Sequence, residues 1–251
     1  MTQSPVSASP ERVAELTERL ATVRARIADA CAAAGRSPDS VELVAVTKTV
    51  PAQDVAALID LGLSAFGENR IQEATAKVAQ VAQLRPAARV RWHVIGGVQR
   101  NKVKALVHWA ERVESVDSVR LADALDTAVR RAMDTGQRRD PLSVLIQYSV
   151  DGDPNRGGIP RADLLRLAEH VSGCAGLRLD GLMAVAPLVG TPTEEAFADI
   201  ESAAAELRSE HPSATVLSAG MSGDLDVAIR HGSTVVRVGT ALVGERRLTS
   251  R

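Results

Sequence analysis

Cysteine, aromatic residues and net charge are all scarce in this chain, and each scarcity argues against a class of protein. The two cysteines, Cys31 and Cys174, stand apart without a partner motif. Neither a disulfide framework nor a cysteine metal site is therefore indicated, and a reducing compartment is expected. Aromatic residues make up 2% of the sequence and the formal net charge is -1. Nucleic-acid binding usually needs a basic surface or stacked aromatic rings, so that class is disfavoured.

Long apolar runs and metal-binding histidine spacings are also missing from the sequence. The N-terminus has no apolar stretch typical of a signal peptide, and no later run approaches membrane-spanning length. We therefore expect a cytoplasmic protein that contacts no membrane. The five histidines show no H-E-x-x-H or related spacing, so no metal site is expected.

What the chain does contain is a regular alternation of short β-branched runs and longer helical patterns. Residues 1–9, rich in Ser and Pro, predict a flexible tail. Apolar residues at three- and four-residue intervals then predict an amphipathic helix from Pro10 to about Ala34. Strands are predicted, each separated from the next by a helix, over residues 41–47, 63–67, 90–96, 112–117, 141–150, 177–185, 214–220 and 234–239.

Eight strands in this alternation favour an α/β fold, a single (β/α)8 TIM barrel with an additional N-terminal helix. No linker is long enough to divide the chain, so residues 10–251 are assigned to one domain. A doubly wound open sheet is the alternative. It is disfavoured because no G-x-G-x-x-G motif follows a strand and because the strand count suits closure.

The first predicted strand, VELVAVT, ends at Lys48. A single lysine at a strand end most often reaches solvent along its flexible stem. If the amine is instead desolvated, its pKa falls, and the neutral form can attack a carbonyl and form a Schiff base. The choice between these two interpretations depends on what the other strands bring to the same end of the barrel.

Small, hydroxylated and glycine residues dominate the loops after the seventh and eighth predicted strands, residues 218–224 and 237–240. In a barrel of this kind these loops commonly bind phosphate. Ser222 is expected to open a helix whose N-terminal amides favour an anion. Ordinary caps and turns would also explain each loop alone. A lysine and a phosphate cradle at one barrel end together indicate pyridoxal phosphate, which needs both.

Six segments carry a resemblance to a known family, and they cover nearly all of the chain from the first strand onward. They are AVTK (45–48), FGENRIQE (66–73), WHVIG with VQRNK (92–102), GLMAVAP (181–187), LSAGMS (217–222) and GSTVVRVGTALVG (232–244). In this order they resemble the pyridoxal phosphate homeostasis protein family, whose members are single barrels of the alanine racemase-like fold.

The resemblance implies that pyridoxal 5'-phosphate is the cofactor and that Lys48 holds it as a Schiff base. It also implies phosphate binding by Ser222 and the amides around Gly239 and Thr240. Arg237 would face the pyridine nitrogen. The residues implied to line the ring are Asn69, His93, Ser218 and Met221.

The function implied is maintenance of intracellular pyridoxal phosphate without catalytic turnover, by a monomer whose possible partners are apoenzymes that receive the cofactor. The alternative is an amino acid racemase, in which a tyrosine from a partner subunit with an added β domain faces the lysine. The chain ends directly after its barrel, and its one tyrosine, Tyr148, lies on the fifth strand and can point either way. A Schiff-base aldolase acting on another phosphorylated substrate suits the geometry but not the motifs.

Overall fold

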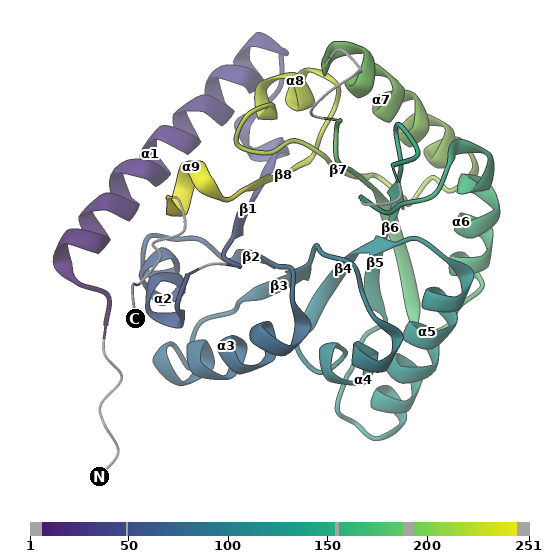
Figure 1. Ribbon diagram of the computed structural model, residues 1–251, viewed down its shortest axis with the longest axis horizontal. Coiled ribbons are helices and arrows are strands. Elements are labelled where there is room, and N and C mark those ends of the chain that lie inside the picture. The colour runs from purple at the N-terminus through teal and green to yellow at the C-terminus, as the bar shows by residue number, and fades with distance from the viewer. Residues whose placement is uncertain (1–6, 49, 154–155, 188–192, 245–251) are drawn as a thin grey trace.

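Eight parallel strands close into a barrel in which each strand pairs with the next and β8 returns to β1 (Figure 1). The structure is a computed structural model that describes residues 7–48, 50–153, 156–187 and 193–244. Residues 1–6 of the predicted tail lie outside this range. The predicted TIM barrel with an added N-terminal helix is confirmed. The strands are β1 Glu42–Val46, β2 Ala65–Glu68, β3 Arg91–Val94, β4 Ala110–Val116, β5 Leu142–Tyr148, β6 Leu177–Ala184, β7 Val216–Ser218 and β8 Val235–Val238.

Helices surround the barrel and connect successive strands (Figure 1). They are α1 Pro10–Ala33, α2 Ala52–Asp60, α3 Ile71–Leu84, α4 Val103–Leu106, α5 Val119–Asp134, α6 Leu164–Ser172, α7 Thr193–Glu210, α8 Leu225–Arg230 and α9 Thr240–Val243. Short 3-10 turns cover Pro38–Ser40, Arg100–Lys102 and Arg161–Asp163. Within the described part of the chain, no helix is both long enough and apolar enough to cross a membrane.

Two helices are shorter than the sequence predicts. Between the third and fourth strands the sequence predicts a helix from about Gln99 to Trp109, and the structure has there only a 3-10 turn and the single turn of α4. Beyond α4, the carbonyl oxygens of Val107 and Ala110 accept hydrogen bonds from Arg138 Nη1 at 3.0 and 2.8 Å, which replaces the partners that a longer helix would supply. The other is α8, which begins at Leu225 instead of Ser222.

Helix α1 packs beside α8 and α9 across the point where β8 meets β1, through the buried residues Leu16, Leu20 and Val23 (Figure 1). Their three- and four-residue spacing creates the apolar stripe that faces the barrel. From the same helix, Arg26 Nη1 donates to the carbonyl oxygen of Ser222 at 2.8 Å, and Arg26 Nη2 lies 2.5 Å from Asp226 Oδ2. The N-terminal helix therefore holds the loop that follows β7.

Strand β6 contains a close approach that only glycine permits. The β5–β6 register shifts between Val144 and Leu145, and on the shifted side Leu145 pairs with Gly181. Gly181 has a φ of 155°, and a Cβ added there would lie 1.8 Å from the carbonyl oxygen of Val216 on β7. The strand can therefore pass its neighbour only without a side chain at this position.

We expect Gly181→Ala to lower the free energy of unfolding by about 3 kcal/mol, because the methyl group forces β6 and β7 apart. Denaturant unfolding followed by far-ultraviolet circular dichroism measures this change. Gly97→Ala is the matched control, since Gly97 has no atom within 4 Å of an added Cβ and no strained φ. Equal stability of the two variants would contradict the assigned β6–β7 packing.

Candidate functional site

A cavity of about 590 Å³ opens at the carboxyl ends of β1 and β8. Its volume is within the usual range for a small-molecule site. Active sites of this fold occupy the same end of the barrel. The cavity is lined by Val46, Lys48, Asn69, Ile95, Val185, Met221, Ser222, Gly223, Arg237, Gly239, Thr240, Val243 and Gly244.

Lys48 stands at the edge of this cavity, two residues beyond the end of β1. Its side chain is exposed, which agrees with the interpretation that the lysine reaches solvent and not with a desolvated amine. The backbone below it is firmly held. Thr47 is fully buried and donates from Oγ1 to Glu68 Oε1 at 2.7 Å, while Lys77 Nζ donates to the Thr47 carbonyl at 2.6 Å and to Glu68 Oε1 at 2.8 Å.

The opposite side of the cavity presents backbone amides from the loops after β7 and β8. The amides of Ser222, Gly223, Gly239 and Thr240 have no acceptor among the described residues. Ser222 Oγ accepts a hydrogen bond from the Ala241 amide at 3.3 Å, which joins the two loops. Unpartnered amides beside a cavity are ready donors to an anion.

The amides after β7 do not belong to a helix N-terminus, which corrects the role expected for Ser222. Asp224 is the residue before α8, and its Oδ1 accepts from the Met221 amide at 2.6 Å. This contact closes residues 221–224 into a turn. An anion would therefore meet the loop amides rather than the start of α8.

A buried polar network lies beneath the cavity and joins five strands. Arg237 on β8 donates from Nη1 to Ser218 Oγ at 2.6 Å and from Nη2 to the Ala184 carbonyl at 2.9 Å. Ser218 Oγ in turn donates to Glu114 Oε2 at 2.6 Å. Glu114 Oε1 lies 2.7 Å from His93 Nδ1. Because these partners come from β3, β4, β6, β7 and β8, the network crosses the interior of the barrel.

The pKa values of Glu114 and Arg237, the two oppositely charged residues of this network, are both shifted from their ordinary values. Burial alone would raise the pKa of Glu114, but His93, Arg237 and Ser218 outweigh it and lower that pKa to about 2. Burial lowers the pKa of Arg237, while Glu114 opposes this change. Glu114 is therefore a carboxylate at every physiological pH, and it compensates the guanidinium charge at the cavity floor.

The structure divides the predicted site residues into two groups. The seven that line the cavity are Lys48, Asn69, Met221, Ser222, Arg237, Gly239 and Thr240. His93 and Ser218 do not line it but lie below, where they contact Glu114. The sequence analysis missed Glu114. Its signal in the sequence was a charged residue in the middle of a predicted strand, with an apolar residue before it and a small residue after it.

Tyr148, the residue considered as a second base, points away from the cavity. It shares the outward face of β5 with Leu142, Val144 and Ile146, and its hydroxyl donates to Asp199 Oδ2 on α7 at 2.5 Å. Burial, then the hydrogen bond to Asp199, raises the pKa of Tyr148 to about 12. Tyr148 therefore cannot remove a proton from a ligand beside Lys48.

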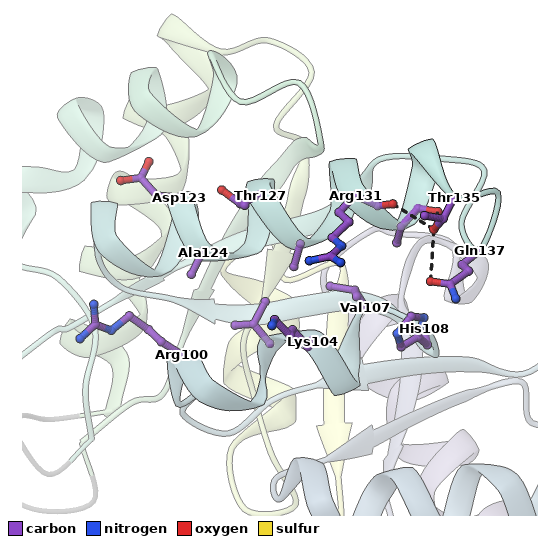
Figure 2. A pocket seen from close by; sticks show the side chains of 13 residues that line it. Arg100, Lys104, Val107, His108, Asp123, Ala124, Thr127, Arg131, Thr135 and Gln137 are labelled. Atoms are coloured by element: carbon purple, nitrogen blue, oxygen red, sulfur yellow. Dashed lines mark hydrogen bonds between the residues drawn. The ribbon is translucent and has the colours of Figure 1, made fainter.

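A larger hollow, of about 710 Å³, lies on the outer layer between α4 and α5. Figure 2 shows side chains of the two helices facing each other across it, including Lys104 from α4 and Thr127 and Arg131 from α5. It shares no lining residue with the cavity beside Lys48 and includes no strand end. The smaller cavity is therefore the candidate site.

Comparison with known proteins agrees with the closed barrel. The family model of the alanine racemase N-terminal domain matches residues 19–247. The pyridoxal phosphate homeostasis protein of Mycobacterium tuberculosis (strain ATCC 25618 / H37Rv) is 47% identical over 254 residues, which cover 98% of each chain.

Two solved structures are also similar to this chain. PipY of Synechococcus elongatus PCC7942, solved with PLP bound, is 34% identical with a TM-score of 0.77 over 91% of this chain and 100% of its own. A protein of unknown function from Bifidobacterium adolescentis is 33% identical with a TM-score of 0.84, over 95% and 98% of the two chains. The chain belongs to the alanine racemase N-terminal domain family and, within it, to the pyridoxal phosphate homeostasis proteins.

We expect Glu114→Gln to lower the free energy of unfolding by about 3 kcal/mol near neutral pH, because it leaves the buried Arg237 charge uncompensated. The folded pKa of Glu114 is depressed from 4.5 to about 2. Its contribution is therefore complete above about pH 4.5 and is lost as the pH falls toward 2. Urea unfolding at several pH values should show the gap between wild type and variant closing over this interval.

Glu111→Gln is the control for this prediction, since Glu111 is an exposed residue on the same strand and the chemical change is identical. It should alter stability by less than about 0.5 kcal/mol. A Glu114→Gln deficit that stays constant from pH 6 to pH 3 would contradict the role of the carboxylate charge.

Proposed function

We propose that this chain binds pyridoxal 5'-phosphate in the cavity beside Lys48 and maintains the supply of this cofactor without catalysing steady turnover. The observation that carries the proposal is that one cavity is lined by a primary amine and by four backbone amides that have no acceptor in the described part of the chain. The relatives named for pyridoxal phosphate homeostasis and the PLP-bound PipY structure support it.

The residues present fit this cofactor. When bound, pyridoxal phosphate supplies an aldehyde that condenses with a primary amine to form a Schiff base. The amine would be that of Lys48, and the amides of Ser222, Gly223, Gly239 and Thr240 would hold the phosphate. Apolar walls for a flat ring come from Val46, Ile95, Val185 and Val243.

Arg237 retains N–H donors that could meet the ring. Both of its Nη atoms are engaged, with Ser218 and with Ala184, whereas its Nε has no partner among the described residues. A guanidinium remains charged and cannot accept a proton. Placed at the ring nitrogen, it disfavours protonation of that atom and weakens the ring as an electron sink.

The lining of the cavity supports holding the cofactor over racemization. Among the described residues that form it, Lys48 and Arg237 are the only ionisable side chains. Racemization needs a proton removed on one face of the substrate and returned on the other, which requires two bases. Tyr148 is turned toward Asp199, so the racemase alternative has no second base among the described residues at this site. The exposed Lys48 instead suits exchange of cofactor with solvent or with apoenzymes that receive it.

Borohydride reduction of the protein loaded with pyridoxal phosphate should fix one cofactor molecule covalently on Lys48. Reduction converts the reversible bond to a stable secondary amine, which peptide mass spectrometry locates. Lys48→Ala should lose the covalent label and the yellow absorbance. Lys104→Ala, which removes an exposed lysine of the α4–α5 hollow, should retain both.

Two outcomes would count against this function. Wild-type protein that takes up no added cofactor would overturn the binding proposal. Appreciable loss of optical activity from single enantiomers of amino acids, retained through repeated purification and abolished in Lys48→Ala, would favour the racemase instead.

Thr240→Pro should weaken retention of pyridoxal phosphate by about tenfold, since proline removes one amide donor to a charged group. Thr240 is the first residue of α9, a position that accepts proline. Thr240→Ala is the control because it keeps the amide and removes only the hydroxyl. Dialysis followed by absorbance of the retained cofactor measures the difference. Equal retention by the two variants would show that this amide does not hold the phosphate.

A further inference from the structure

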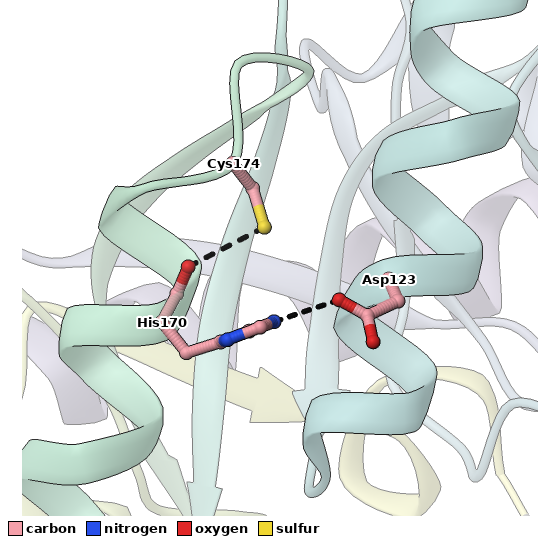
Figure 3. Close-up of side chains that lie close together, drawn as sticks. All are labelled: Asp123, His170 and Cys174. Atoms are coloured by element: carbon pink, nitrogen blue, oxygen red, sulfur yellow. Dashed lines mark hydrogen bonds and ion pairs between the residues drawn. The ribbon is translucent and has the colours of Figure 1, made fainter.

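Three side chains with metal-binding chemistry converge on the outer surface between α5 and α6, away from the cofactor cavity. They are Asp123 on α5, His170 on α6 and Cys174, which follows α6 (Figure 3). Each offers one donor atom, and these atoms all lie within 4.8 Å of one another. No spacing motif covers the whole cluster, because Asp123 comes from a different helix and meets His170 and Cys174 only when α5 and α6 pack together.

The present contacts show that the three donors already face a common point. His170 Nε2 lies 2.7 Å from Asp123 Oδ1, and Cys174 Sγ lies 3.4 Å from the carbonyl oxygen of His170. In Figure 3 the imidazole points across the gap between the helices toward Asp123, and the thiol lies above it. Donor atoms around a tetrahedral zinc ion are about 3.5 Å apart, so rotations of these side chains suffice to form a site.

The backbone around the cluster is fixed, which limits the cost of forming such a site. Asp123 and His170 lie inside regular helices. Cys174 donates its amide to the Val171 carbonyl at 3.0 Å, and its own carbonyl accepts from the Leu177 amide at 3.0 Å. Asp123 is exposed and the other two are partly buried, so an ion can enter from solvent while the thiol remains held against the core.

The identity of the donors selects the metal. A thiolate, an imidazole and one carboxylate suit a borderline-soft cation such as Zn²⁺, whereas Mg²⁺ and Ca²⁺ prefer oxygen donors alone. Three protein ligands leave the fourth tetrahedral position for water. We propose that Asp123, His170 and Cys174 form a binding site for Zn²⁺ or a cation of the same class, which ties α5 to α6.

Titration of the chelator-treated full-length protein with Co²⁺, a spectroscopic substitute for Zn²⁺, tests this site. A bound thiolate produces a charge-transfer band in the near ultraviolet and tetrahedral coordination produces visible bands. We expect one equivalent to bind with both signals and to be displaced by Zn²⁺. Cys174→Ala should abolish the charge-transfer band and weaken binding at least tenfold, and His170→Ala should weaken it to a similar degree.

Two controls separate this site from adventitious binding. His211→Ala removes a neighbouring half-buried histidine that contacts Ser172 and is outside the cluster, so it should bind Co²⁺ as the wild type does. Cys31 is retained in every variant, so a signal from that thiol would persist in Cys174→Ala. Circular dichroism and retention of pyridoxal phosphate confirm that each variant is folded, and Cys174→Ser serves if the alanine variant is not.

The proposal is overturned if the wild type binds no stoichiometric Co²⁺ or Zn²⁺. It is also overturned if folded Cys174→Ala and His170→Ala bind these ions as tightly as the wild type. Neither result would affect the proposed cofactor function, because the cluster shares no residue with the cavity beside Lys48.

Discussion

Pairing of β8 with β1 is the constraint on which the candidate site depends. The ladder runs from Glu42 opposite Val235 to Ala45 opposite Val238. It brings the residues after β1 beside the residues after β8, and a Cβ on Gly239 would lie 3.4 Å from Val46 Cβ. In an open sheet β1 and β8 would not be neighbours. The amine and the loop amides would then belong to separate places, and closure of the barrel makes them one site.

The buried pair of Arg237 and Glu114 is better explained by orientation than by stability. Burying two charges costs several kcal/mol in lost hydration, and a well-packed apolar pair of similar volume is often as stable. What apolar residues could not provide is a charged donor fixed at the cavity floor. Glu114 acts on Arg237 through Ser218, and His93 holds the far oxygen of Glu114. These contacts fix the orientation of the guanidinium, so its Nε is held in one direction without any contribution from a bound ligand.

The sequence predicted the barrel well because the period of apolar residues directly reflects burial. The span of α1 is confirmed, since it depends on residues close together in the chain. The start of α8 was wrong because the Asp224 side chain closes a turn with the Met221 amide, a local competition that the apolar period does not reveal. The sequence left open whether Lys48 is exposed or desolvated, because this depends on how neighbouring loops surround the end of β1.

Glu114 and Tyr148 show what alternation along a strand can and cannot predict. Tyr148 follows Leu142, Val144 and Ile146 at two-residue intervals, so the four side chains lie on the same face of β5. Once the first three are assigned to the face that packs against the helices, the sequence places Tyr148 on that face as well. Glu114 on β4 has the opposite orientation and needs partners from other strands to be buried as an ion. Those partners, His93, Ser218 and Arg237, are far from it in the sequence, and only the closed barrel brings them together.

The same alternation bears on the choice between holding a cofactor and catalysis. In a barrel each strand contributes alternate side chains to the interior, so a second base supplied by a strand and facing Lys48 would take an inward position near the end of that strand. Gln147 occupies the inward position just before Tyr148, and an amide cannot exchange protons as a base near neutral pH. Its side chain instead donates to the Arg156 carbonyl at 2.7 Å and secures the loop after β5. The alternation of inward and outward side chains therefore gives the end of β5 a structural role. Among the described residues that line the cavity, Lys48 is the one base.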